Sequence, residues 1–298
     1  AADEVHDLLG AGGGDDPVVL RDQVEDGHLD DPEIDPVIFS IGFLKIRWYG
    51  MMYVLALVSA LYIAKSVVKR DKLAIEQSQL DDYFIYIEIG IILGARLGYI
   101  LFYDPNTGYY LSHPWQMFNP FSKEGEFVGI RGMSYHGAII GWFLGSLYYH
   151  RRHPEVSFGI IMDVVALAVP VGYMFGRIGN FLNKELIGRT TDLPWGIYVD
   201  GVLRHPSQIY EAILEGLVVF LVIYLYRTHK RFNGELILLY GFAYGLMRFT
   251  AEFWRQPDVQ LGFLFGGWLT MGQLLSFGMM LTAVILWFYF NKRLVKKK

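Results

Sequence analysis

The stretch GRIGNFLNKELIGR, residues 176–189, follows an apolar run yet carries two arginines, two asparagines, a lysine and a glutamate. The guanidinium groups of Arg177 and Arg189 match phosphate oxygens in two-point contacts. Asn180 adds a neutral donor, and glycines such as Gly188 let the main chain approach a ligand closely. These residue types, beside an apolar segment, favour a site for an anionic headgroup that carries phosphate.

A second set of charges follows a helical spacing. Arg248 and Glu252 are four residues apart, and Gln208, Glu211 and Glu215 are three and four apart, so each set lies on one helical face. A charge inside a membrane span costs about 2.5–3.5 kcal/mol on insertion scales. That cost favours a functional role for Arg248 and Glu252, with Arg248 as a third phosphate candidate, over a purely structural pair.

Further candidates are single residues. His136, within MSYHG, is the natural proton acceptor near neutral pH, although a lone histidine is equally explained as a hydrogen-bonded interfacial residue. Arg47 and Tyr49 begin the first apolar segment. Arg96 lies in the outer half of the second, whose Glu88 is expected to be a solvated charge at its inner end.

The elements that must hold these residues are long apolar segments. Of the 298 residues, 53% are hydrophobic and 19% charged, with a mean hydropathy of +0.29; a soluble domain carries about 25% charged residues. A membrane-spanning helix needs roughly 20 apolar residues. The sequence predicts an all-α, polytopic membrane protein with about seven spans, namely 48–68, 84–103, 134–149, 158–176, 207–226, 235–254 and 268–290.

The loop charges predict the orientation of these spans. Lysines and arginines cluster after the first, third, fifth and seventh spans, and such residues stay on the cytoplasmic side. The predicted N-terminus is therefore outside and the C-terminus inside. With this topology, the polar motifs of six spans meet at the level of the outer leaflet, and residues 176–189 follow the outer end of the fourth span.

Two regions of distinct composition divide the chain. Residues 1–36 hold twelve acidic residues against Arg21, and we expect an exposed, mostly disordered outer tail. Residues 37–298 are the expected seven-helix catalytic domain. The chain has no cysteine, which excludes disulfides, zinc–thiolate sites and a thiol nucleophile of its own. The G-x-S-x-G nucleophile pattern is absent, so two substrates that react directly are favoured over a covalent enzyme intermediate.

The motifs resemble those of the prolipoprotein diacylglyceryl transferase family. The resemblance rests on GRIGNFLNKELIGRTTDLPWG, and on RWYG, GARLGYILFY, MSYHGAIIG, RHPSQIYEAILEG and YGLMRFTAEFWRQPD, from Asp35 to the end of the seventh span. It implies transfer of the diacylglyceryl group of phosphatidylglycerol to the lipobox cysteine of a prolipoprotein signal peptide. A thioether forms and glycerol-1-phosphate leaves, with no cofactor and no metal. The implied partners are these two substrates and membrane lipids, not nucleic acid. The implied location is the bacterial cytoplasmic (inner) membrane, with the active site toward the outer leaflet.

The resemblance also assigns site residues. Phosphatidylglycerol binding falls on Arg177, Asn180, Glu185 and Gly188, together with the phosphate candidate Arg189. Catalytic roles fall on His136, Arg248, Glu252 and Tyr49. The chain departs from the family pattern at Arg47, where some relatives have histidine, and at Ala138, where glycine is frequent. The outer segment between residues 189 and 204 is also short.

Two other functions compete with this reading. A lipid or anion transporter could use the same arginine-lined cavity, but transporters commonly contain internal repeats, and no convincing repeat relates the two halves of this chain. The polar groups also lie toward one leaflet, which favours an enzyme. An alcohol phosphotransferase would need a multi-aspartate metal signature, which this sequence lacks.

Overall fold

A computed structural model describes residues 37–41, 44–121, 125, 127, 129–130, 132–257, 263–264 and 267–295. The predicted tail, residues 1–36, lies outside the described residues. The longer helices are α1 (Trp48–Arg70), α2 (Gln77–Phe102), α4 (Tyr135–Arg152), α5 (Phe158–Leu182), α8 (Glu235–Ala251) and α9 (Met271–Val295). One further helix is continuous and consists of α6 (Ser207–Glu211), the π-helical turn η2 (Ala212–Val218), α7 (Val219–Tyr226) and the 3₁₀ turn η3 (Arg227–His229). Short helices α3 (Thr107–Ser112) and η1 (Pro114–Gln116) follow α2.

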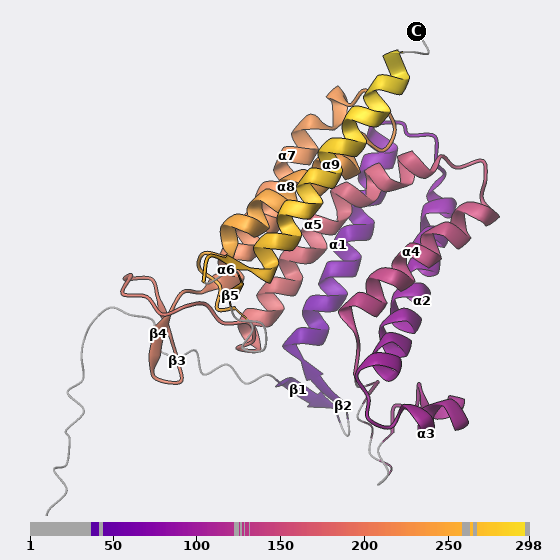
Figure 1. The fold of residues 1–298 in the computed structure, drawn as a ribbon. Coiled ribbons are helices and arrows are strands. Elements are labelled where there is room, and N and C mark those ends of the chain that lie inside the picture. Colours follow the sequence, from indigo (N-terminus) through magenta and orange to yellow (C-terminus); the bar gives the residue numbers. More distant parts are fainter. Residues whose placement is uncertain are drawn as a thin grey trace, which may run out of the picture.

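The strands form three antiparallel hairpins. They are β1–β2 (Val37–Ile41, Leu44–Arg47), β3–β4 (Ile197–Val199, Val202–Arg204) and β5–β6 (Phe263–Leu264, Leu269–Thr270). The hairpins lie at one end of the helix bundle, and the C-terminal end of α9 lies at the other end (Figure 1). Within the β3–β4 hairpin, Asp200 and Gly201 have φ angles of 51° and 75°, which fits a tight two-residue turn.

Membrane-spanning length and composition are found in five helices of the described chain. They are α1, α2, α5, the continuous helix Ser207–His229, and α9 as far as Arg293. This confirms the prediction of a mostly helical protein with several helices able to span a membrane. The two other predicted spans are also helices, α4 with 18 residues and α8 with 17. Seven spans and the orientation of the termini remain predictions.

Helices α2 and α4 form a close pair. A Cβ atom at Gly98 would lie 2.9 Å from Gly137 Cα, and one at Gly145 would lie 2.8 Å from the carbonyl oxygen of Tyr86. Gly94 and Gly141 face the partner backbone in the same way. Small residues at this four-residue spacing let two membrane helices approach each other closely.

The bundle is packed most densely around α5. One buried cluster joins α5 to α1, α2 and α4 through residues such as Ala64, Tyr83 and Tyr149. A second joins α5 to α1, α7 and α8 through residues such as Val67 and Ile223. Both clusters use the first half of α5, residues 160–168. The second half of α5 therefore extends from a fixed base toward the end of the bundle where the hairpins lie.

The start of α2 and the role of Glu88 differ from expectation. The helix begins at Gln77, seven residues before the predicted span, because Glu76 and Gln79 form a capping box in which the main-chain N–H of Glu76 donates to Gln79 Oε1 at 2.9 Å. Glu88 consequently lies in the middle of the helix. It is no solvated end charge, since Tyr53 on α1 donates its hydroxyl to Glu88 Oε2 at 2.9 Å.

Candidate functional site

The GRIGNFLNKELIGR segment is half helix and half loop. Helix α5 continues to Leu182, so the expectation that the whole segment follows the span is wrong. Ile178, Phe181 and Leu182 extend the apolar character of the helix by another two turns. Arg177 and Asn180, three residues apart, consequently project from one helical face. The loop that follows contains two left-handed residues, Lys184 and Leu186, with φ angles of 55° and 56°.

A fully buried glutamate, Glu211, is the centre of the site. It ends α6, where the π-helical turn begins, and such turns are frequent at functional sites. Its Oε2 atom lies 2.8 Å from Nε of Arg177, and its Oε1 atom lies 3.0 Å from Nη1 of Arg248 and 3.4 Å from Nη1 of Arg255. One carboxylate thus contacts three guanidinium groups from three segments of the chain.

A second fully buried carboxylate, Glu215, lies one turn further along the π-helical segment. It accepts a hydrogen bond from the hydroxyl of Tyr173, and its Oε1 atom lies 3.5 Å from Nη1 of Arg248. Tyr173 also accepts a 2.7 Å hydrogen bond from Nε of Arg177, whose guanidinium carbon lies 4.8 Å from the centre of the tyrosine ring. Tyr173 therefore connects the arginine of the motif to the second glutamate.

A third buried carboxylate, Glu252, follows α8. It pairs with Nη2 of Arg248, lies 3.8 Å from Nε of Arg255, and accepts a 2.7 Å hydrogen bond from the hydroxyl of Thr270. A Cβ atom at position 272 would lie 2.5 Å from Glu252 Oε1, so a larger residue at Gly272 would displace the carboxylate from its contacts. The start of α9 thus closes the network on this side.

Among the described residues, the charges of the network are equal in number. Its three arginines, Arg177, Arg248 and Arg255, face its three glutamates, Glu211, Glu215 and Glu252. The side chains of Arg177 and Arg248 are each 14% exposed, so the ions lie largely out of water. Buried ions require such pairing, because removing one partner leaves an uncompensated charge. Two of the three predicted phosphate-binding arginines, Arg177 and Arg248, are therefore held in place by carboxylates.

The network continues to the surface through Asn180. The amide oxygen of Asn180 accepts a 3.4 Å hydrogen bond from Nη1 of Arg177, and its amide nitrogen donates to Glu185 Oε2 at 3.0 Å. The exposed Glu185 is itself fixed through its carbonyl oxygen, which accepts a 2.6 Å hydrogen bond from Gln208 Nε2. The predicted residues Arg177, Asn180 and Glu185 thus form a continuous chain from the buried network to the solvent-facing loop.

The predicted residues Gly188 and Arg189 support the end of α8. Gly188 packs so closely on the main chain of His205 that a side chain would collide with it. Arg189 donates from Nε to the carbonyl of Arg255 at 2.8 Å and from Nη2 to the carbonyl of Glu252 at 2.9 Å. Within the described residues its guanidinium is thus held by carbonyls and not by a carboxylate, so its charge is not cancelled by a contact.

The field of this arginine reaches a titratable neighbour. Burial and, second, the charge of Arg189 lower the pKa of His205, in the loop between β4 and α6, below its ordinary value. His205 also packs edge-on against the ring of Tyr210. The region around Arg189 therefore disfavours a further positive charge and is suited to an anion.

Two predicted catalytic residues lie outside the network. Tyr49, half exposed in the first turn of α1, packs on α5 at Gly179, next to Asn180. His136 is exposed in the first turn of α4 and lines a groove of about 800 Å³ between α2 and α4. Arg96 fixes the loop before α4 by donating to the carbonyls of Met117 and Gly132. The structure therefore places Tyr49 beside the site and His136 on a neighbouring helix pair.

Three members of the network were not predicted. Tyr173 is four residues before Arg177, and Arg255 is three after Glu252, so helical spacing from known candidates could have identified both. Thr270 carries no such signal, because its contact with Glu252 depends on the hairpin that precedes α9.

Comparisons with known proteins show to which family the chain is related. The family model described as "Prolipoprotein diacylglyceryl transferase" matches residues 36–289. The chain is 58% identical over 259 residues to the phosphatidylglycerol–prolipoprotein diacylglyceryl transferase of Wolinella succinogenes, covering 87% of this chain and 94% of the relative. It is 59% identical over 251 residues to that of Campylobacter jejuni, covering 84% and 92%. The corresponding protein of Aliarcobacter butzleri is 56% identical over 259 residues, covering 87% and 94%.

Proposed function

Because the chain belongs to the prolipoprotein diacylglyceryl transferase family, we propose that it moves the diacylglyceryl group of phosphatidylglycerol to the lipobox cysteine of a prolipoprotein. The protein is a transferase. In the reaction, the cysteine sulfur attacks the glycerol carbon that bears the phosphate ester. A carbon–sulfur bond forms, the carbon–oxygen bond breaks, and glycerol-1-phosphate leaves. The thiol proton passes to a base.

The observation that carries the proposal is the buried network, which joins five of the residues assigned by resemblance. They are Arg177, Asn180, Glu185, Arg248 and Glu252. Negative charge builds on the phosphate oxygens as the leaving group departs, and fixed cations lower the energy of that state. Carboxylates that hold the guanidinium groups in place before the substrate arrives avoid reorganisation during the reaction.

The arginines have different proposed roles. Arg189, whose charge no contacting carboxylate cancels among the described residues, attracts and holds the phosphate. Arg177 and Arg248 stabilise the developing charge from the network, and Asn180 presents a neutral donor. This division follows from the pairing of each guanidinium group. If the roles are divided in this way, replacing Arg189 by an uncharged residue should weaken lipid binding more than it lowers turnover.

His136 is the proposed base, and Tyr49 assists at the reacting thiol. A free thiol has a pKa of about 8.5, so removal of its proton near neutral pH benefits from an acceptor. The prolipoprotein then lies between the α2–α4 pair, which carries His136, and the network on α5 to α8. The proposed location is the bacterial cytoplasmic membrane, with the site toward the outer leaflet, the end of the bundle where the hairpins lie (Figure 1).

Reconstitution tests the function directly. The purified chain in vesicles that contain phosphatidylglycerol is mixed with a lipobox peptide, and glycerol phosphate release and the mass of the peptide are measured together. We expect both products in equal amounts, and neither with a peptide whose cysteine is replaced by serine. Movement of phosphatidylglycerol between leaflets without any thioether product would favour the transporter and refute the proposal.

A further inference from the structure

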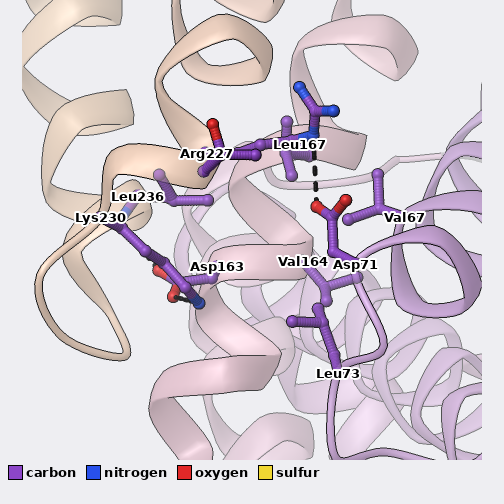
Figure 2. Close-up of a pocket in the computed structure, with 10 residues that line it drawn as sticks. Val67, Asp71, Leu73, Asp163, Val164, Leu167, Arg227, Lys230 and Leu236 are labelled. Atoms are coloured by element: carbon purple, nitrogen blue, oxygen red, sulfur yellow. Dashed lines mark hydrogen bonds and ion pairs between the residues drawn. The ribbon is translucent and has the colours of Figure 1, made fainter.

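A second charged pocket lies at the end of the bundle opposite the site. Its volume is about 350 Å³, and it is enclosed by the last turn of α1, the first half of α5 and the turn after α7. A helix rises 1.5 Å per residue, so Asp163 in this pocket lies roughly 21 Å along α5 from Arg177. We call it the inner pocket. Its polar lining, among aliphatic side chains, consists of Asp71, Asp163, Arg227, Lys230 and Thr228. The first four are labelled in Figure 2.

Two ion pairs stand on different sides of the inner pocket (Figure 2). Asp163, 1% exposed, accepts from Lys230 Nζ at 2.7 Å and from the main-chain N–H of Leu236 at 2.8 Å. Asp71 Oδ2 lies 3.2 Å from Arg227 Nε. Asp163 therefore has its hydrogen bonds supplied, and the two cations are the groups with capacity for another partner.

Lys230 and Arg227 have N–H groups that their present contacts do not use. An ammonium group has three N–H donors, and within the described residues the contact of Lys230 is with Asp163. Arg227 donates from Nη1 to the carbonyl of Tyr224, but its buried Nε atom, although close to Asp71, makes no hydrogen bond in the described structure. Nε of Arg227 is ion-paired with Asp71, and an oxyanion between Arg227 and Lys230 would accept from the N–H groups that the existing contacts of the two cations leave over.

The charge balance also favours an anion. The lining itself holds two cations and two carboxylates, and Arg70, outside the lining at the end of α1, also contacts Asp71. With Arg70 included, three cations face two carboxylates. This contrasts with the equal numbers in the network around Glu211. A phosphodiester carries one negative charge and would bring the sum to zero. The pocket lies at the ends of apolar helices, and basic pockets between membrane helices on the cytoplasmic side bind anionic lipid headgroups.

We propose that the inner pocket is a second lipid site, which holds the phosphodiester of an anionic phospholipid between Arg227 and Lys230. The hydroxyl of Thr228, at the exposed rim, is a third donor. The aliphatic walls, which include Val67, Leu73 and Leu167, contact the glycerol and upper acyl carbons. This lipid is bound and not consumed, because it lies far from the proposed site of reaction.

The experiment uses cardiolipin, a phosphodiester lipid other than the proposed substrate. The delipidated full chain is titrated with cardiolipin in neutral detergent, and bound lipid is counted by native mass spectrometry. We expect Arg227→Gln and Lys230→Gln each to weaken binding about tenfold, the effect of losing one hydrogen bond to a charged group. Arg231→Gln is the matched control, since Arg231 is the next basic residue and pairs with Glu235 outside the pocket.

The outcomes separate the possibilities. Equal weakening by the Arg231 control would assign the effect to general surface charge and overturn the proposal, as would unchanged binding in both pocket variants. Competition by inorganic phosphate that removes all bound cardiolipin would assign the pocket to a free anion instead of a lipid. If Lys230→Gln does not fold because Asp163 loses its cation, Arg227→Gln and Thr228→Val decide the question, since neither leaves a fully buried carboxylate without a partner.

Discussion

Replacing Glu211 by glutamine tests whether charge balance holds the site together. The two side chains have nearly the same shape, so the change removes one negative charge with little loss of packing. Glu211 is fully buried and contacts Arg177 at 2.8 Å, Arg248 at 3.0 Å and Arg255 at 3.4 Å. In the variant, three guanidinium groups would face two carboxylates. The N–H groups of the glutamine amide would also face N–H groups of an arginine, where no hydrogen bond can form.

The expected loss is large. Removing one partner of a buried ion pair costs about 3–5 kcal/mol, because the remaining charge stays out of water without compensation. One kcal/mol corresponds to about 2–4 °C in the unfolding midpoint of a domain of this order of size, so the midpoint should fall by about 6–20 °C. The matched control is Glu155→Gln, since Glu155 is 56% exposed and pairs with His153 at the surface; there we expect less than about 0.5 kcal/mol.

The assay is thermal unfolding in detergent, followed by tryptophan fluorescence and by circular dichroism. The double variant Glu211→Gln with Arg255→Gln restores equal numbers of charges, and it should recover part of the loss. Two results would refute the reasoning. One is a Glu211→Gln midpoint that matches the Glu155→Gln control, and the other is a double variant whose loss equals the sum of the two single losses.

Further predictions concern activity, topology and pH. Arg177→Lys should lose most of its turnover, since a point charge cannot replace the two-point geometry of guanidinium, and near-normal turnover would show a structural role. His136→Gln should lower turnover with lipid binding intact, and the defect should shrink as pH approaches the thiol pKa of about 8.5; a pH-independent defect would exclude the base role. A cysteine at Asp192 should react with an impermeant reagent from outside, and one at His229 only after permeabilisation. The pKa of His205 is lowered in the folded chain. As the pH falls, His205 is therefore protonated in the unfolded chain at a higher pH than in the folded chain. The stabilising contribution of that residue is therefore complete above pH about 6.5 and falls as pH drops below it, and His205→Gln should flatten this part of the stability profile.

Apolar composition was enough to predict where the long helices lie, but it did not predict the residues at which they begin and end. Each predicted span coincides with a helix, because long apolar segments in a membrane must satisfy their own main-chain hydrogen bonds. The polar first turns of α2 were missed, since hydropathy does not register the capping box of Glu76 and Gln79. The end of α5 was placed too early because Arg177 and Asn180 suggested a loop, whereas they lie on the last turns of the helix.

Pairs within one helix were predictable, and pairs between helices were not. The four-residue spacing of Arg248 and Glu252 correctly indicated their contact. The choice of Glu211 as the common partner of three arginines depends on how α5, α6 and α8 approach each other, which periodicity cannot give. The π-helical turn that carries Glu215 has no sequence signal of its own, and it contains Gly216, where a side chain would come within 2.8 Å of Met174.

The balanced network has a consequence for how the chain enters the membrane during synthesis. Helix α5 arrives first with one network cation, Arg177, and the next membrane helix brings two anions, Glu211 and Glu215. The next helix, α8, and the turn after it carry two arginines and one glutamate. The summed charge of the network therefore changes from plus one to minus one and reaches zero only when this last segment is in place. A nascent chain stopped before α8 would carry an unmatched buried acid. We therefore expect α8, the shortest of the helices that coincide with predicted spans, to be held in the membrane by its neighbours as much as by lipid. Chains truncated before α8 should be removed by proteolysis.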